Sequence, residues 1–156
     1  MKKFFFDCGT RDATASLGLL ALRMMVGLMM LIGHGIPKIQ NFHAILKHGF
    51  YQPDLFPLNL MSTKVSLMMA IGAEVAASSL LVLGLMTRPA AFIFGFSMVV
   101  AAFGALGTAP WFCAWTGPSK ELALMYLIPV IAVILSGAGG YSLDAAIYKE
   151  SKRRRW

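Results

Sequence analysis

The chain has 156 residues, of which 58% are hydrophobic and 13% are charged, and its formal net charge is +7. Soluble domains carry about 25% charged residues, and one of this length could not bury so much apolar surface, so the composition indicates a membrane protein. The positive charge does not indicate nucleic-acid binding, because the basic residues gather at the two chain ends and not on one face of a folded domain. We expect these ends to contact anionic lipid headgroups.

The first residues, MKKFFFDCGTRDA, resemble a signal peptide only in their positive start. Their apolar run covers residues 4–6 before Asp7, whereas a signal peptide needs an apolar region of roughly 7–15 residues. No small-residue motif of the kind that marks a lipoprotein precedes Cys8. We therefore expect no cleavage.

Four apolar stretches follow along the chain, at about residues 17–37, 65–86, 90–110 and 121–137. Each is near the roughly 20 residues that a helix needs to cross the hydrocarbon core. The runs are continuous and do not alternate, and four strands cannot close a barrel, so helices are favoured. The sequence predicts an all-α fold: one integral membrane domain over residues 1–156, built as a transmembrane four-helix bundle.

The loop between the first two stretches predicts a short helix at the membrane surface. In NFHAILKHGF, Asn41 is a good helix cap and Gly49 a good helix end. Between them the apolar side chains share one face, and His43 and Lys47 lie on another. His43 and His48 are five apart and do not share a face, so we expect no metal site there.

The distribution of lysine and arginine predicts the orientation in the membrane. Nine basic residues fall on one side and four on the other. The first side holds Lys2, Lys3, Arg11, Arg88, Lys149, Lys152, Arg153, Arg154 and Arg155, and the second holds Lys38, Lys47, Lys64 and Lys120. Both termini should therefore be cytoplasmic, with residues 149–156 as a basic anchoring tail. The predicted location is a bacterial inner membrane.

Ionisable residues inside predicted spans are candidate functional residues, because charge in hydrocarbon is costly. Arg23 and His34 are eleven residues apart, so they share one stripe of the first helix. Counting about 1.5 Å per residue places Glu74 near the midplane and Arg23 somewhat deeper. We therefore expect Arg23 and Glu74 to form a charge pair, either as a structural clamp or as a functional site.

His34 and Glu121 form a second predicted layer, near the outer surface. A histidine changes its charge near neutral pH, and a nearby carboxylate could share a proton with it. These residues are our candidate catalytic residues. The alternative is that His34 only bonds a loop carbonyl where the helix ends. Pro37 and Lys38 are expected to mark the end of that span and the headgroup layer.

Other chemical motifs are missing from the sequence. It contains no Cys-x-x-Cys, and the two cysteines, Cys8 and Cys113, are predicted to lie on opposite sides of the membrane. A self-contained dithiol oxidoreductase is therefore disfavoured. There is also no glycine-rich phosphate loop, no zinc-ligand spacing and no nucleophile elbow. No cofactor is evident, and no metal is predicted.

Three segments together resemble the DoxX family of small four-helix bacterial inner-membrane proteins. They read LRMMVGLMMLIGHGIPKI, GAEVAASSLLVLGLMTRPAA and KELALMYLIPVIAVILSGAGGYSLD, and the resemblance runs from about Leu17 to Asp144. It marks as motif positions Arg23, His34, Gly35, Lys38, Glu74, Arg88, Glu121, Tyr141 and Asp144. The resemblance implies an association with quinone-linked sulfur oxidation or with thiol and oxidative-stress systems, so a bound quinone is possible.

Three functions remain open at this point. The first is an accessory or structural subunit of a membrane redox complex, without catalytic activity of its own. The second is a quinone-reactive oxidoreductase subunit that uses His34 and Glu121 for protons. The third is a small carrier or channel that uses Arg23 and Glu74. We favour the first, and expect the lipid bilayer and other membrane proteins or further copies of the chain as partners, and no nucleic acid.

Overall fold

The computed structural model describes residues 9–10, 12–52, 58–113 and 117–153, and for residues 150–153 the backbone alone. All secondary structure within this part of the chain is helical, as predicted. Several residues of the sequence analysis lie outside the described part. They are Lys2, Lys3, Cys8, Arg11, Arg154 and Arg155.

The first long helix runs without interruption from Ala13 to Gln40. It consists of α2 (Ala13–Met30), a π-helical segment η1 (Leu31–Gly35) and α3 (Ile36–Gln40). Asp12 starts it by accepting a hydrogen bond from the Ala15 N–H at 2.7 Å. Pro37 does not end the helix, contrary to expectation, because the wider π-helical turn before it accommodates the proline.

A short helix follows directly, as predicted. It is α4 (Phe42–His48), and Gly49 ends it with φ at 88°. The expected cap is wrong in detail, because the Asn41 side chain donates backward to the Pro37 carbonyl at 2.9 Å and caps nothing in α4. Its predicted apolar face is half-buried and its His43 and Lys47 face is exposed.

The remaining helices correspond to the other apolar stretches. After a 3-10 turn η2 (Leu58–Leu60), the second long helix consists of α5 (Thr63–Gly72), η3 (Ala73–Ala77) and α6 (Ser78–Leu83). The third consists of α7 (Thr87–Val99) and η4 (Val100–Ala105). The fourth is α8 (Glu121–Ser136), and the polar helix α9 (Leu143–Arg153) follows it. The first three long helices each contain a π-helical segment, η1, η3 and η4. Such segments are frequent at functional sites.

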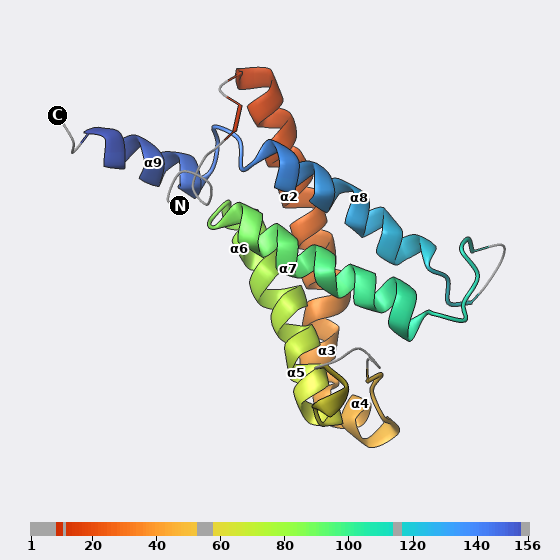
Figure 1. The fold of residues 1–156 in the computed structure, drawn as a ribbon. Coiled ribbons are helices and arrows are strands. Elements are labelled where there is room, and N and C mark those ends of the chain that lie inside the picture. Colours follow the sequence, from red (N-terminus) through yellow and green to blue (C-terminus); the bar gives the residue numbers. More distant parts are fainter. Residues whose placement is uncertain (1–8, 11, 53–57, 114–116, 154–156) are drawn as a thin grey trace.

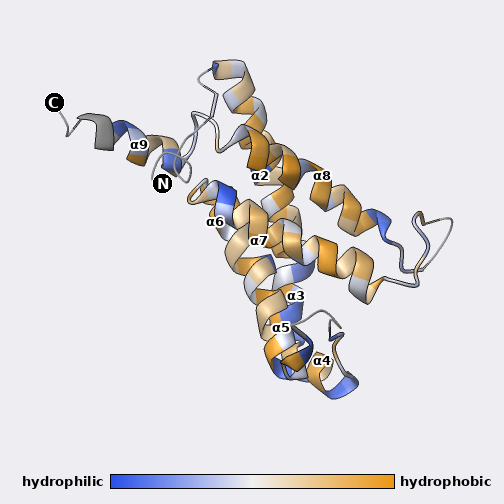
Figure 2. Cartoon of the chain, viewed as in Figure 1, coloured by the Kyte–Doolittle hydropathy of each residue, from blue (hydrophilic) through white to orange (hydrophobic). Residues whose placement is uncertain are grey.

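The long helices have the surface of a membrane protein. Those over Ala13–Gln40, Thr63–Leu83 and Thr87–Ala105 are long and apolar enough to span a bilayer, and α8 is apolar but shorter, with 16 residues. Only 22–33% of the residues in the apolar windows of the three long helices are buried. Apolar colour dominates these helices in Figure 2, whereas α4, α9 and the start of α8 carry polar colour. The apolar side chains thus face outward, where lipid would cover them.

The helices pack in two pairs that meet near the α6–α7 turn. Figure 1 shows α2 and α3 running along α5 and α6, and α7 running along α8. Glycine brings the first pair close: a Cβ at Gly27 would lie 2.6 Å from Val82 Cγ2, and one at Gly35 would lie 2.8 Å from Val75 Cγ2. The pairs diverge toward the ends of α3 and η4. The cavities of the molecule lie toward those ends.

Candidate functional site

Arg23 does not pair with Glu74, so that prediction is wrong. Its guanidinium is 1% exposed and donates to the Leu81 carbonyl at 3.0 Å and to the Tyr141 carbonyl at 2.8 Å. Its electrostatic partner is Asp144. The predicted stripe of α2 is nevertheless present, since Arg23 is buried together with Gly27 and Met30. Arg23 therefore ties α2 to the last turn of α6 and to the segment before α9.

Asp144 organises this region through its carboxylate. It accepts the backbone N–H groups of Met86 and Thr87 at 2.8 and 2.9 Å and the Thr87 hydroxyl at 2.8 Å. Met86 starts α7 without a side-chain cap of its own, so Asp144 satisfies N–H groups that a helix N-terminus leaves unbonded. The Asp144 N–H in turn donates to the Gly84 carbonyl at 2.9 Å. We call Arg23, Gly84, Thr87 and Asp144 the Asp144 cluster, and its bonds are those of a structural clamp.

Glu74 instead forms an ion pair with Lys38, through Glu74 Oε1 and Lys38 Nζ. Lys38 comes from α3, after the π-helical turn of η1, and Glu74 lies in η3. The expectation that Lys38 lies at the depth of the headgroup layer stays a prediction, but its ammonium is paired with Glu74 inside the bundle. The side chains are 26% exposed for Lys38 and 8% exposed for Glu74.

The Glu74 carboxylate is only half satisfied by protein groups. Glu74 Oε2 is buried and has no hydrogen-bond partner within the described residues. Buried polar atoms in folded proteins are nearly always bonded to protein, to water or to a ligand. Glu74 Oε2 therefore needs a partner that the described protein groups do not supply, such as water or a ligand.

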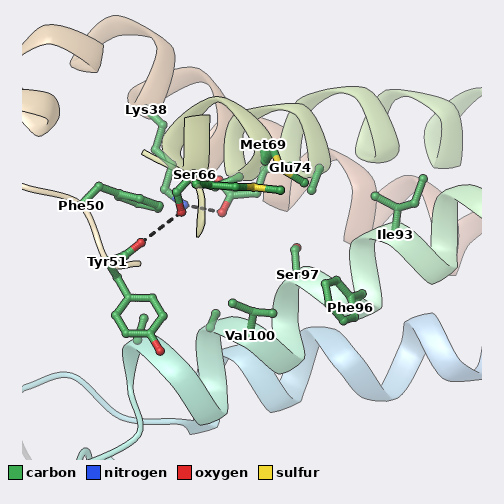
Figure 3. Close-up of a pocket in the computed structure, with 15 residues that line it drawn as sticks. Lys38, Phe50, Tyr51, Ser66, Met69, Glu74, Ile93, Phe96, Ser97 and Val100 are labelled. Atoms are coloured by element: carbon green, nitrogen blue, oxygen red, sulfur yellow. Dashed lines mark hydrogen bonds and ion pairs between the residues drawn. The ribbon is translucent and has the colours of Figure 1, made fainter. Parts of the chain in front are cut away.

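The first cavity beside this pair is apolar and measures about 320 Å³. It lies between α5 and η3 on one side and α7 and η4 on the other, and Lys38 and Glu74 form its polar end (Figure 3). We call it the apolar cavity. Most of its lining is aromatic, aliphatic or thioether, including Phe50, Tyr51, Met69, Ile93, Phe96 and Val100.

The second cavity measures about 620 Å³ and lies on the other side of the same ion pair, against α8. We call it the Glu121 cavity. Its polar lining consists of His34, Lys38, Glu74, Cys113, Ser119, Glu121 and Tyr126. Several residues at its rim, among them Cys113, Gly117 and Pro118, are exposed, so it opens to the surface at the loop before α8.

The structure places His34 and Glu121 in this one cavity without a direct hydrogen bond between them. The His34 ring contacts the Tyr126 ring edge-on, with 5.8 Å between centroids. Glu121 begins α8, where its Oε2 accepts the Cys113 N–H at 2.9 Å. His34 therefore faces the interior, and its ring lies against Tyr126.

The other motif positions serve packing or the Asp144 cluster. Gly35 permits the close contact between η1 and η3. Tyr141 contributes its carbonyl to Arg23, while its side chain is exposed. Arg88 lies half-buried in the first turn of α7. Of the nine positions, His34, Lys38, Glu74 and Glu121 line the cavities, Arg23, Tyr141 and Asp144 take part in the bonds of the Asp144 cluster, and Gly35 serves packing.

Sequence reasoning missed the apolar cavity and the aromatic residues that the first loop contributes to it. Tyr51 is fixed there because its carbonyl accepts the Ser66 hydroxyl at 3.2 Å (Figure 3). Its ring lies against Gly104, where a Cβ would approach the Tyr51 hydroxyl to 2.6 Å. Aromatic residues in a loop before a span were a usable signal, but the sequence does not tell which helix they fold against. Within the described residues, no group of His, Cys, Asp and Glu is arranged to hold a metal ion.

Comparison with known proteins identifies the family. The family model described as DoxX matches residues 18–108. A protein of Haemophilus influenzae described as uncharacterized is 27% identical over 152 residues, which cover 96% of both chains. Another uncharacterized protein of that organism is 32% identical over 131 residues, covering 83% of this chain and 90% of the relative. No solved structure matches significantly.

Proposed function

The chain belongs to the DoxX family, and from that premise we propose that it is a quinone-binding subunit of a membrane redox complex. The observation that carries the proposal is the apolar cavity with the buried Lys38–Glu74 pair at its end. A quinone has an apolar body and polar oxygen atoms, and this cavity offers the matching surfaces. Its 320 Å³ falls within the range of about 300–1,000 Å³ that is usual for small-molecule sites.

The residues present fit such a ligand. The ring would lie among Phe50, Phe96 and Val100, which line the cavity body. The Lys38 ammonium carries three donors, of which Glu74 Oε1 takes one, so it can also donate to a ligand oxygen. Figure 3 shows the Tyr51 ring across the cavity from this pair. When bound, a quinone would supply electron-acceptor chemistry coupled to proton uptake.

The chain's own part in this function is to bind, orient and handle protons. Lys38 provides positive charge where a ligand oxygen would become more negative. The aromatic and methionine side chains exclude bulk water, which strengthens that electrostatic effect. The electrons would come from a partner protein, which makes the chain an accessory subunit and not an independent enzyme. His34 and Glu121 lie in the Glu121 cavity and would act on protons, not on the ligand directly.

The orientation completes the proposal. We place α8 across the membrane as a fourth span, with both termini in the cytoplasm of a bacterium and the loop before α8 outside. The basic α9 would lie along the inner surface, where Lys149 can approach anionic headgroups.

The experiment measures quinone in the purified protein and compares two neighbouring valines. Val100 lines the apolar cavity, whereas Val99 is 38% exposed and is not part of the cavity lining. The protein is extracted in mild detergent and its lipids are identified by mass spectrometry. Wild type and Val99→Trp should retain quinone, and Val100→Trp should lose it because the indole fills the cavity. Equal quinone content in the two variants, or none in wild type, contradicts the proposal.

Transport is a second candidate, favoured by the two cavities that meet at one ion pair. A carrier or channel would carry protons or a small solute past Glu74. It predicts flux into liposomes that contain the purified chain, and loss of that flux in Glu74→Gln. Liposomes that contain wild type and show no flux would remove this candidate.

A further inference from the structure

The two cavities are separated by little more than the Lys38–Glu74 pair. Three residues line both of them: Lys38, Glu74 and Ala101. Exposed residues form the rim of the Glu121 cavity, and the apolar cavity lies between α5 and η3 on one side and α7 and η4 on the other. A small species that passes directly from one cavity to the other would pass beside these side chains.

Glu74 is equipped to accept a proton at this point. Glu74 is 6% exposed, and its Oε2 has no hydrogen-bond partner within the described residues while its Oε1 binds Lys38. An unbonded carboxylate oxygen in a buried site is costly unless water, a ligand or a proton reaches it. Glu74 lines the Glu121 cavity, whose rim is exposed, so water that enters this cavity can come close to the carboxyl group.

Polar side chains line the way from the surface to Glu74. Glu121 lies near the rim of the Glu121 cavity, and His34 and Tyr126 contact each other deeper within it. The ionisable side chains that line the two cavities together with Glu74 are Lys38 from α3, His34 from η1, Glu121 and Tyr126 from α8, Cys113 from the loop before α8 and Tyr51 from the first outer loop. The described residues of α7 and η4 bring no ionisable side chain to either cavity.

We propose that Glu74 takes up protons from the aqueous phase through the Glu121 cavity, with Lys38 as its counter-charge. The proton leaves water at the cavity mouth, passes along cavity water and His34, and bonds to Glu74 Oε2. The ion pair thereby changes from a net charge of zero to a net charge of plus one, because Lys38 keeps its own proton. The positive charge then faces the apolar cavity, where it favours a more negative ligand oxygen.

This inference deepens the proposed function by naming the source of protons for that site, but it rests on geometry that exists without a quinone. Its test therefore uses quinone-free liposomes that contain the full chain with Cys8→Ser. Dicyclohexylcarbodiimide reacts with protonated carboxyl groups in apolar surroundings and leaves a stable mass label. The labelling rate at Glu74 is read from peptides by mass spectrometry at a series of pH values.

We expect Glu74 labelling to rise as the pH falls, by up to about tenfold per pH unit, as for uptake of one proton. The label should vanish in Glu74→Gln and persist in Glu74→Asp, which keeps the carboxyl group. In Lys38→Met, labelling should be strong even at high pH, because the loss of the counter-charge favours the neutral acid. Glu74 labelling that does not change with pH, or an absence of labelling in wild type, overturns the proposal.

The route is tested by plugging the Glu121 cavity. Cys113 lines this cavity and has an exposed free thiol, so a bulky, membrane-impermeant maleimide can be attached there. A pH jump should then protonate Glu74 at least about tenfold more slowly, while Cys113→Ser treated with the same reagent keeps the wild-type rate. Equal rates with and without the plug overturn the route through this cavity. No quinone is present in these liposomes, so the two proposals can fail separately. If Glu74 labelling fails, the quinone content of the Val100→Trp variant still tests the proposed function. If no quinone binds, Glu74 labelling still tests proton uptake.

Discussion

The Lys38–Glu74 pair should show strong energetic coupling in a double-mutant cycle. Lys38→Met removes the counter-charge of the buried Glu74 carboxyl group, and breaking a buried pair in this way costs about 3–5 kcal/mol. Because Lys38 is 26% exposed, we expect the lower end, about 3 kcal/mol. Glu74→Gln should cost about 1–2 kcal/mol, since the long lysine side chain can move its ammonium toward water.

The double variant Lys38→Met with Glu74→Gln should be little worse than Glu74→Gln alone. The coupling energy between the two substitutions is then about 2 kcal/mol or more. Substitutions at independent sites deviate from additivity by no more than roughly 0.5 kcal/mol. The free energy of unfolding is measured for all four proteins by titration with denaturing detergent from mild-detergent micelles. Lys47→Met, at an exposed lysine of α4, is the control and should change stability by less than about 0.5 kcal/mol. Additive single effects would refute the ion pair.

Other consequences of the structure can be tested by the same unfolding assay or by labelling. Arg23→Met should destabilise the protein by about 3–5 kcal/mol, because it removes two hydrogen bonds from a charged group to the Leu81 and Tyr141 carbonyls, each worth about 1.5–3 kcal/mol; a loss below about 1 kcal/mol contradicts the clamp. Gly27→Ala should cost about 1–3 kcal/mol through overlap with Val82, whereas Gly18→Ala, where a Cβ meets nothing within 4 Å, should be neutral or stabilising. In intact cells, an impermeant maleimide should label Cys113 without disruption of the membrane, and labelling only after lysis would contradict the proposed orientation.

The sequence predicted the helices and the buried stripe of α2 because both follow from periodicity and hydropathy alone. It failed on the charge pairs. Counting residues along a helix gives depth, but it does not give lateral position in the bundle or the reach of a long side chain. Lys38 crosses to Glu74 from a position that depth alone assigns to the surface. Arg23 binds backbone carbonyl groups at the end of α6 and before α9, which no pattern of charged residues reveals.

The cavities were beyond sequence reasoning for a related reason. They arise where the helix pairs diverge and where the first loop folds its aromatic residues back between them. The π-helical turns add to this, because each shifts the face that a helix presents by part of a turn. His34 and Glu74 both lie in such turns. The residue types were evident in the sequence, whereas their meeting at one point depended on tertiary packing.

The most direct test of the central claim is to locate a photoreactive quinone on the full chain. The purified protein in liposomes is irradiated with a quinone that carries a photoreactive group on its ring, and the modified peptides are mapped by mass spectrometry. The account predicts modification of cavity residues such as Phe50, Met69 and Val100, suppressed by excess unmodified quinone. Modification confined to lipid-facing residues such as Phe92 or Ile128, with no effect of the competitor, would contradict it.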